Sequence, residues 1–466
     1  MELNSLRQPK ISLEDYPFKQ DLENRLLLAQ FHSNDLLVLE EILYSSLQIP
    51  IAKLAKNVDL TEDELIRILV KLSKTGLFAF EKETIVVDKE LRKYFEVQLL
   101  KFDPDFKPGM DFLESVLRKV PIHVLPLWYS IPRTSNHIFD SIIERYLLTP
   151  QIFQRYLEDL TFADPVLMAI IKEVYSSEEF KVYGKDLIEK YHLSKEQFEE
   201  YLLLLEFHFV CCLRYEKHGD TYREIVTPFQ EWQDYAYFLK KTETPQLPSS
   251  AHIERKRPAD FSYIQDLTHL LTLAKKQPFA MEPTAETLEL LFKKMEGLSS
   301  ENTDYVNQLI SKLIQLKLAS IVEGRFYALE SANDFLDLSL ENKALFFYRH
   351  PLNRLSFKGI PADMVTDRVL RDTEKSILRV LTTGWVYFDD FLKGVMVSLS
   401  ETSAVSLKKL GKSWKYNIPL YSDEELALIR IVVLEWLFEM GITAVGKESG
   451  KDCFCVTAFG RSLFGS

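Results

Sequence analysis

Residues 423–461 read DEELALIRIVVLEWLFEMGITAVGKESGKDCFCVTAFGR, and this stretch decides how the rest of the chain is interpreted. Apolar residues recur at helical spacing up to Met440, and Gly441 follows, a residue type that commonly ends helices. Ser422 and Glu425 have the spacing of a capping box. Two β-prone runs, at 442–445 and 453–457, then flank a polar turn. The sequence therefore predicts a capped helix followed by a β-hairpin.

The same order of a helix pair and a hairpin recurs three times upstream. The upstream helices are expected at 35–47, 51–56 and 61–74, at 166–175, 184–191 and 194–207, and at 284–295 and 303–316. Their strands are expected at 77–80 and 84–87, at 209–215 and 222–227, and at 318–322 and 326–329. Thr61 with Glu64, and Ser194 with Gln197, repeat the capping box. Only 15 glycines in 466 residues disfavour glycine-rich nucleotide-binding folds. The predicted fold class is mainly α with small β-hairpins.

The final strand closes on Thr457, Gly460 and Arg461, a Thr-x-x-Gly-Arg sequence that resembles the wing of many winged-helix proteins. With the three upstream copies, the chain resembles a tandem winged-helix (helix-turn-helix) protein. It is also similar to winged-helix accessory regions of bacterial helicase-related proteins. This resemblance implies winged-helix modules at 1–101, 161–241, 263–340 and 372–466, a helical bridge at 102–160, a linker at 242–262 and a connector at 341–371.

The composition narrows the classes of function. A formal net charge of −12 repels polyanions on average, so nucleic-acid binding would need a local basic patch. The four cysteines lack metal-ligand spacing and fit a reducing compartment. The first ten residues are polar, without the apolar core of a signal peptide, and no run is apolar enough for a membrane span. We expect a cytoplasmic protein without membrane contact.

The first turns of the helices that would read DNA are acidic. A helix that reads base edges favours Arg, Lys, Asn, Gln or Ser in this turn. The acidic residues predicted to dock protein partners are Glu62, Glu64, Glu196, Glu199, Glu424 and Glu425. The alternative is that these carboxylates only complement the helix macrodipole. We expect a non-enzymatic adaptor for protein partners whose identity the sequence does not give, within a DNA-associated assembly.

Basic residues supply the alternative function, a DNA-binding transcriptional or architectural regulator acting through the C-terminal module. Lysines and aromatic residues interleave at 408–416, a combination that suits nucleic acid, although a solvated loop is the competing interpretation. The candidate contacts are Lys408, Lys409, Lys412, Trp414, Lys415, Arg430 and Arg325. The run Arg255, Lys256 and Arg257 is interpreted as solvated charge in the linker.

Catalytic motifs are absent from the sequence. Residues 441–448 approach the phosphate-binding loop, but Glu448 replaces the hydroxyl that would hold magnesium, and a helix precedes the motif where a strand should. No His-Glu-x-x-His or Gly-x-Ser-x-Gly sequence occurs. We therefore expect no catalytic residue, metal site, cofactor or small-molecule substrate. An enzyme on an unfamiliar helical scaffold would need a pocket that the sequence does not reveal.

Overall fold

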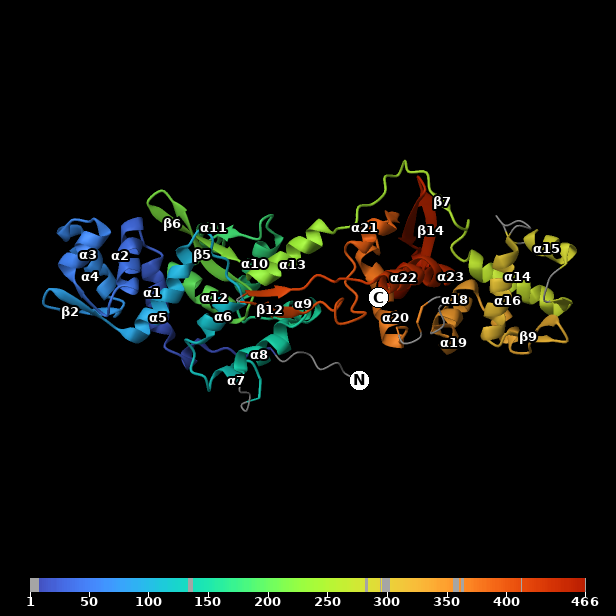
Figure 1. Ribbon diagram of the computed structural model, residues 1–466, viewed down its shortest axis with the longest axis horizontal. Helices are drawn as coiled ribbons and strands as arrows, with labels where there is room; N and C mark the ends of the chain where they lie inside the picture. The colour runs from blue at the N-terminus through green and yellow to red at the C-terminus, as the bar shows by residue number, and fades with distance from the viewer. Residues whose placement is uncertain are drawn as a thin grey trace. The chain divides into compact units, whose positions relative to one another are not determined.

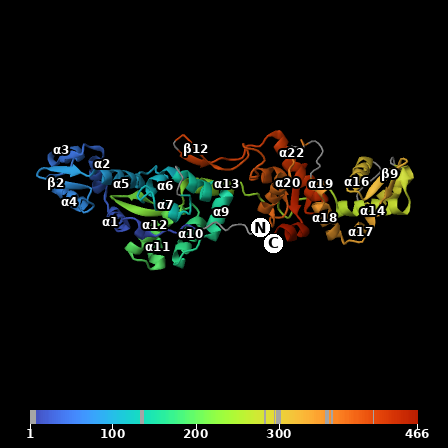
Figure 2. The same cartoon turned by 90° about the horizontal axis from the view of Figure 1, so that it is seen from below.

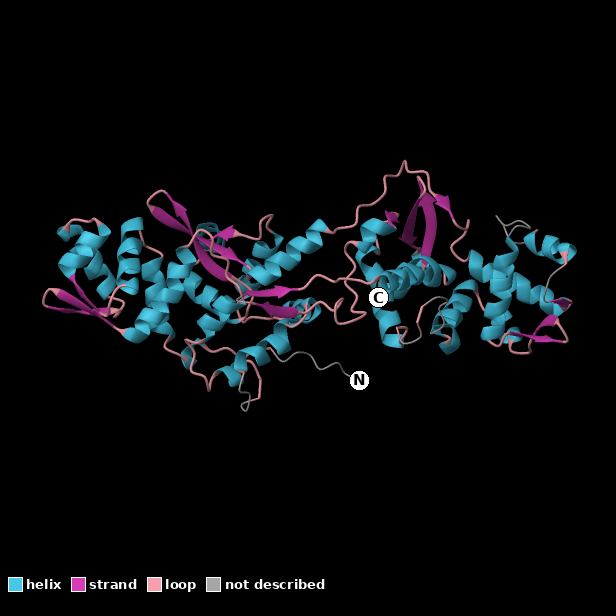
Figure 3. Cartoon of the chain, viewed as in Figure 1, coloured by secondary structure: helices cyan, strands magenta, loops and turns pink. Residues whose placement is uncertain are grey.

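The computed structural model describes residues 8–132, 137–280, 284–293, 295, 302–354, 360–361, 364–411 and 413–465. The chain forms two compact units. Unit 1 comprises Met1–Tyr237 and Ser406–Asn417, and unit 2 comprises Phe238–Val405 and Ile418–Ser466. Both units are mainly α-helical, with small antiparallel sheets of two to four strands (Figures 1 and 3). This confirms the predicted fold class. Within the described ranges, no helix combines the length and the apolar character that crossing a membrane requires.

The first repeated segment lies in unit 1. Its elements are α2 (Ser33–Tyr44), β1 (Gln48–Pro50), α3 (Ile51–Val58), α4 (Glu62–Ser73), β2 (Phe78–Glu81) and β3 (Thr84–Val87). The strands pair in the order β1-β3-β2, and Leu54, Leu65, Leu69 and Ile85 fill the space between sheet and helices. Asp59 ends α3 in the left-handed conformation, and Thr61 caps α4 through the predicted box with Glu64. Local capping thus fixes where α4 begins.

The second segment, also in unit 1, repeats this order. Its elements are α10 (Pro165–Ser176), β4 (Val182–Tyr183), α11 (Gly184–Tyr191), α12 (Lys195–Phe207), β5 (Cys212–His218) and β6 (Thr221–Thr227), and its sheet order is β4-β6-β5. The predicted capping box of Ser194 and Gln197 is present. At the turn of the β5–β6 hairpin, the Asp220 carbonyl oxygen accepts a hydrogen bond of 3.0 Å from the Ser33 amide, at the start of α2. The tip of this hairpin therefore contacts the first segment.

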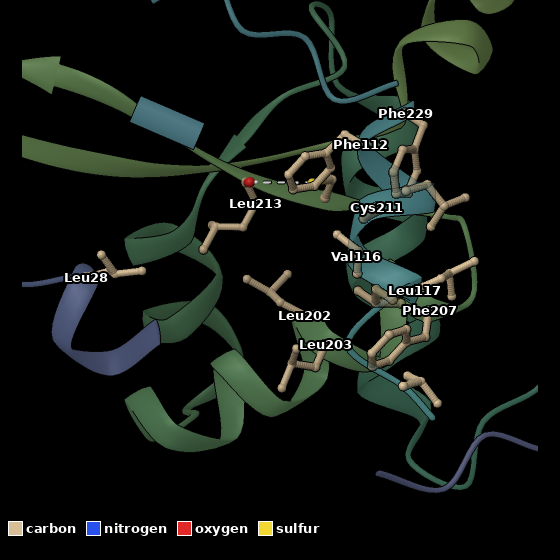
Figure 4. Packing of buried hydrophobic residues seen from close by; sticks show 14 of the residues in the cluster. Leu28, Phe112, Val116, Leu117, Leu202, Leu203, Phe207, Cys211, Leu213 and Phe229 are labelled. Carbon is tan, nitrogen blue, oxygen red and sulfur yellow. Dashed lines mark hydrogen bonds between the residues drawn. The ribbon is translucent and has the colours of Figure 1, made fainter. Parts of the chain in front are cut away.

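Further helices of unit 1 surround these two segments. They are α1 (Phe18–Leu28), α5 (Lys89–Leu99), α6 (Met110–Leu117), α7 (Leu125–Trp128), α8 (Ile138–Ile142), the π-helix η3 (Ile143–Leu147), α9 (Pro150–Asp159) and the first two turns of α13 (Gln230–Lys241), whose residues from Phe238 belong to unit 2. Figure 4 shows Leu28 of α1, Val116 of α6 and Leu202 of α12 around the same apolar core. Within 102–160, for which the sequence suggested only a helical bridge, apolar side chains of residues 102–131 and 142–160 thus form part of the core of unit 1.

Unit 1 also includes a hairpin from late in the chain. Strands β12 (Leu407–Leu410) and β13 (Ser413–Tyr416) pair with each other and lie beside α6 (Figures 1 and 2). The Leu407 amide donates to the Leu148 carbonyl oxygen at 2.7 Å, and the Tyr416 hydroxyl donates to that of Leu147 at 2.7 Å. Lys408, Lys409 and Lys415, which the sequence associates with the C-terminal module, therefore belong to unit 1.

Unit 2 contains the third and fourth repeats. The third has α14 (Ser262–Lys276), β8 (Phe279–Ala280), α15 (Ala285–Phe292), α16 (Thr303–Gln315), β9 (Ala319–Val322) and β10 (Arg325–Ala328), with sheet order β8-β10-β9. The helices α17 (Ala332–Leu336), α18 (Leu340–Arg349) and α19 (Pro351–Arg354) follow. The fourth has α20 (Asp367–Glu374), η5 (Lys375–Val380), β11 (Val386–Tyr387), α21 (Phe388–Leu392), α22 (Asp423–Ile431), the π-helix η6 (Val432–Trp436), α23 (Leu437–Glu439), β14 (Thr443–Glu448), β15 (Lys451–Val456) and α24 (Ala458–Phe464). Leu428, Val433, Trp436 and Phe454 are among the side chains of its core.

The segment expected to be a linker is partly built into unit 2. Strand β7 (Glu254–Arg255) extends the fourth sheet, whose order is β11-β15-β14-β7. Arg257 is buried, and its Nη2 lies 2.7 Å from Oδ2 of Asp266. The interpretation of Arg257 as solvated charge is wrong. Its carboxylate partner lies on α14, which follows the linker, so the composition of the linker alone did not reveal this ion pair.

Candidate interaction surfaces

Helix α4 presents an apolar face to solvent. Leu65, Leu69 and Leu72 turn one side of the helix into the core. On the other side Ile66 is 42% exposed and Val70 is 53% exposed. These two residues are one helical turn apart, so their side chains are neighbours on the surface. Together they give α4 an apolar patch that the described residues of unit 1 leave exposed.

Carboxylates border this patch at the start of α4. Glu62, Asp63 and Glu64 form its first turn, and all three are exposed. Glu64 is engaged by the cap: its carboxylate accepts hydrogen bonds from the Thr61 hydroxyl at 2.6 Å and the Thr61 amide at 3.2 Å. The hydrogen bond from the Thr61 hydroxyl, and then that from the backbone, lower the pKa of Glu64. Glu62 and Asp63 therefore supply most of the free negative charge beside Ile66 and Val70.

Helix α12, the equivalent helix of the second segment, is covered. Glu196 is exposed, but the Glu199 side chain is fully buried. The guanidinium of Arg25, on α1, donates from Nε to Oε2 of Glu199 at 2.8 Å and from Nη1 to Oε2 of Glu206 at 2.9 Å. The prediction that Glu199 docks a protein is wrong, because α1 occupies that face of α12.

A charge cluster holds α1 against α12. Lys101 Nζ lies 3.0 Å from the second oxygen of Glu206, and Lys195 Nζ lies 2.8 Å from Oε1 of Glu199. Burial alone would raise the pKa of Glu206, but Arg25, Lys101 and Lys119 together hold this pKa well below its ordinary value. The pKa of Arg25 is likewise held above its ordinary value, since the attraction of Glu206 and Glu199 outweighs the cost of burial. Both carboxylates thus remain ionised inside unit 1.

A groove of about 1040 Å³ opens beside this cluster, between α1, α5 and the end of α6. At its base, the Asp21 carboxylate accepts hydrogen bonds from Tyr94 at 2.6 Å, from Tyr16 at 3.1 Å and from Lys119 at 3.2 Å. Burial would raise the pKa of Asp21, but Lys119 and Arg25 keep it below its ordinary value. Because Asp21 and Lys119 neutralise each other's charge, they form a structural ion pair at the bottom of the groove, between α1 and the α6 region.

No pattern in the sequence indicated Asp21, Arg25, Lys101 or Lys119 as members of this cluster. One available signal was Glu206, a carboxylate inside the apolar run that ends at Leu213. A carboxylate surrounded by apolar residues in a folded interior requires a cation nearby, but the pattern does not say which one.

The corresponding helix of the fourth segment is also mostly buried. Trp436 Nε1 donates to Oε1 of Glu374, on α20, at 2.8 Å, and the side chains around it are buried. Glu424 is exposed, but Glu425 is only 3% exposed. The Glu425 carboxylate accepts hydrogen bonds from the Ser422 amide at 2.7 Å and the Ser403 hydroxyl at 3.1 Å. The prediction that Glu425 docks a protein is wrong, since its charge serves the helix cap.

The two candidate arginines of unit 2 are separate from each other. Arg430 is ion-paired with Asp452 of β15, and its guanidinium lies 5.2 Å from the centroid of the Phe388 ring. Arg325 is exposed at the β9–β10 turn, where Gly324 has a φ of +72°. Arg430 is therefore a paired cation on α22, whereas Arg325 is an exposed cation at the start of β10.

The hairpin β12–β13 brings the remaining candidates together. Lys408 and Lys415 are direct partners across the two strands, and Lys409 pairs with Trp414. Trp414 is half-buried, its ring 6.2 Å from that of Phe139, whereas Lys408, Lys409 and Lys415 are exposed. Lys412 lies outside the described residues. The hairpin therefore gathers three lysines, but the tryptophan expected to stack on bases faces the protein.

The metal-binding and phosphate-loop patterns considered in the sequence can be compared with the described parts of the chain. No group of three or more His, Cys, Asp or Glu residues there could hold a metal ion. Gly441 ends a helix with a φ of +69°, and residues 443–448 form β14. A phosphate loop needs a helix N-terminus at this place, and a strand stands there instead.

No protein-family model matches the chain, and no curated protein sequence matches it. The winged-helix resemblance therefore stays a prediction.

Proposed function

We propose that the chain is a non-enzymatic adaptor of winged-helix modules, in which the outer face of α4 docks a protein partner. The observation that carries this proposal is the exposed pair Ile66 and Val70 on α4, bordered by free carboxylates. A partner with apolar side chains and nearby Lys or Arg would bury the pair and neutralise Glu62 and Asp63.

The repeated order of elements supports winged-helix modules. In each segment, a short strand precedes the second helix and pairs with a strand of the following hairpin. In helix-turn-helix proteins the last helix before the hairpin is the one that meets DNA. Among the four segments, α12 is covered by α1, and the α22–α23 helix is mostly buried. The exposed side chains of α16 are polar, namely Asp304, Asn307, Gln308 and Ser311, so α4 is the apolar candidate for contact.

The charge of α4 favours protein over nucleic acid. Its first turn contains three carboxylates, which would face phosphates across a few ångströms. The DNA-binding alternative through the C-terminal segment has less support, because Arg430 is already paired with Asp452. We place the adaptor in the cytoplasm, within a DNA-associated assembly. The four free cysteines, three of them buried, fit a reducing compartment.

Site-specific photocrosslinking tests the proposal. A photoreactive phenylalanine analogue replaces Ile66 or Val70, and a matched control replaces Asn307, an exposed polar residue on α16. We expect a discrete crosslinked protein from positions 66 and 70 in cells, and at least a fivefold lower yield from position 307. The Glu62→Lys/Asp63→Lys variant should reduce this product, because it removes the charge complementarity. Equal labelling at all three positions, or no change in the charge-reversed variant, would contradict docking on α4.

A further inference from the structure

The outer face of the β12–β13 hairpin contains an unfavourable arrangement of charge. Lys408 and Lys415 lie directly opposite each other on adjacent strands, and both are exposed. Like charges in this position destabilise a strand pair. Among the residues that the structure describes, no carboxylate lies within ion-pair distance of either ammonium group. The pair thus costs stability without an internal partner to offset it.

The inner face of the hairpin contacts the rest of unit 1 through residues other than Lys408 and Lys415. Leu407 is 4% exposed, and two hydrogen bonds join Leu407 and Tyr416 to the backbone at the end of η3. Trp414 packs against Phe139. Lys409 shares this side, where its Nζ lies 3.5 Å from Oδ1 of Asp111 and 5.6 Å from the centroid of the Trp414 ring. The attachment of the hairpin therefore leaves Lys408 and Lys415 free and holds them on a fixed support.

We propose that this outer face binds the phosphate backbone of duplex nucleic acid through Lys408 and Lys415. A two-stranded β-ribbon is one of the elements that the major groove of DNA admits. Lysines on both strands of such a ribbon can reach phosphates on both sides of the groove. Each phosphate would supply the counter-charge that its lysine lacks on the hairpin.

Two competing anionic partners fit the hairpin less well. Single-stranded nucleic acid is held largely by stacking on exposed aromatic rings, and Trp414 is half-buried against Phe139. A membrane surface requires considerable apolar burial besides charge. On the described part of the hairpin, Leu410, 60% exposed, is the one large apolar side chain with that degree of exposure.

Fluorescence anisotropy with the full chain and a labelled duplex of random sequence tests this proposal across a salt series. Two phosphate contacts predict a log–log salt slope of about −2. The Lys408→Glu/Lys415→Glu variant should bind at least tenfold more weakly at low salt and lose most of this slope. The matched control is Lys19→Glu/Lys172→Glu, which alters exposed lysines of α1 and α10 and changes the net charge equally. The control should keep the slope.

The single variant Lys408→Glu separates binding from folding. It places a carboxylate opposite Lys415, so the hairpin should be at least as stable as in the parent chain while affinity falls. The proposal is overturned if the parent chain does not bind the duplex at low salt, or if both double variants lose affinity equally. Tighter binding to single strands or to anionic phosphatidylserine vesicles than to the duplex would also overturn it. None of these outcomes bears on docking at α4, which lies on a different element.

Discussion

Replacing Arg25 by methionine should loosen the contact between α1 and α12. The guanidinium is 1% exposed and pairs with two carboxylates that are fully buried. Removing one partner of a buried ion pair costs roughly 3–5 kcal/mol, because the remaining charge loses its compensation. Glu206 keeps Lys101 at 3.0 Å and Glu199 keeps Lys195 at 2.8 Å, so we expect the lower end of this range, about 3 kcal/mol.

Hydrogen exchange measured by mass spectrometry reports this change in the full chain. A loss of about 3 kcal/mol corresponds to roughly a hundredfold faster exchange of the most protected amides. We expect this acceleration in peptides covering α1 and α12, and little change in peptides from unit 2.

A double-mutant cycle then tests the pairing itself. Glu199→Leu in the Arg25→Met background removes a carboxylate that has lost its main partner, so the double variant should be more stable than the sum of the single effects predicts. We expect a coupling free energy of about 1–3 kcal/mol. Exchange accelerated less than about fivefold, or strictly additive effects, would refute a cluster that holds α1 against α12.

Two further substitutions test other features of the fold. Burial raises the pKa of Glu231 to about 7, so the folded chain holds this proton more tightly than the unfolded chain does, and stability is lost as pH rises from about 4.5 to 7. Glu231→Gln should therefore raise the free energy of unfolding at pH 8 by about 2 kcal/mol and make this free energy less dependent on pH. Urea denaturation between pH 5 and 8 measures both effects. An unchanged pH profile would contradict the raised pKa of Glu231. Thr457→Val removes a hydroxyl that accepts from the Gly460 amide at 3.0 Å and donates to the Gly441 carbonyl oxygen at 2.7 Å. This substitution should lower the stability of unit 2 by about 2 kcal/mol, as measured by thermal unfolding. Thr457→Ser keeps the hydroxyl and should retain most of the parent stability.

The sequence predicted the locally determined parts of the fold. The capping boxes at Thr61, Ser194 and Ser422 are all confirmed, because each depends on side chains and amides three residues apart. The hairpins also follow from local signals, since turn residues and β-prone runs are adjacent in the chain. The short strands before the second helices were not predicted. β1 has only three residues and pairs with β3, more than thirty positions later, so its conformation depends on a distant partner.

The candidate residues were harder to place, because burial depends on contacts between distant segments. Glu196 and Glu199 lie in the same turn of α12, yet one is exposed and the other is fully buried. The difference comes from α1, about 170 residues away along the chain. The periodicity of α12 alone does not predict which of the two glutamates α1 covers. Lys408 and Lys415 were found because the chain brings them close in sequence, although the unit that holds them was not foreseen.

The acidic first turns of these helices therefore have more than one physical role. Glu64 and Glu425 accept hydrogen bonds in capping boxes, and Glu199 neutralises a buried arginine. Such carboxylates would be present whether or not a partner binds, so their number is not an argument for docking. What separates α4 from α12 is exposed apolar surface beside free charge, which has no structural purpose inside unit 1. The adaptor proposal rests on that surface.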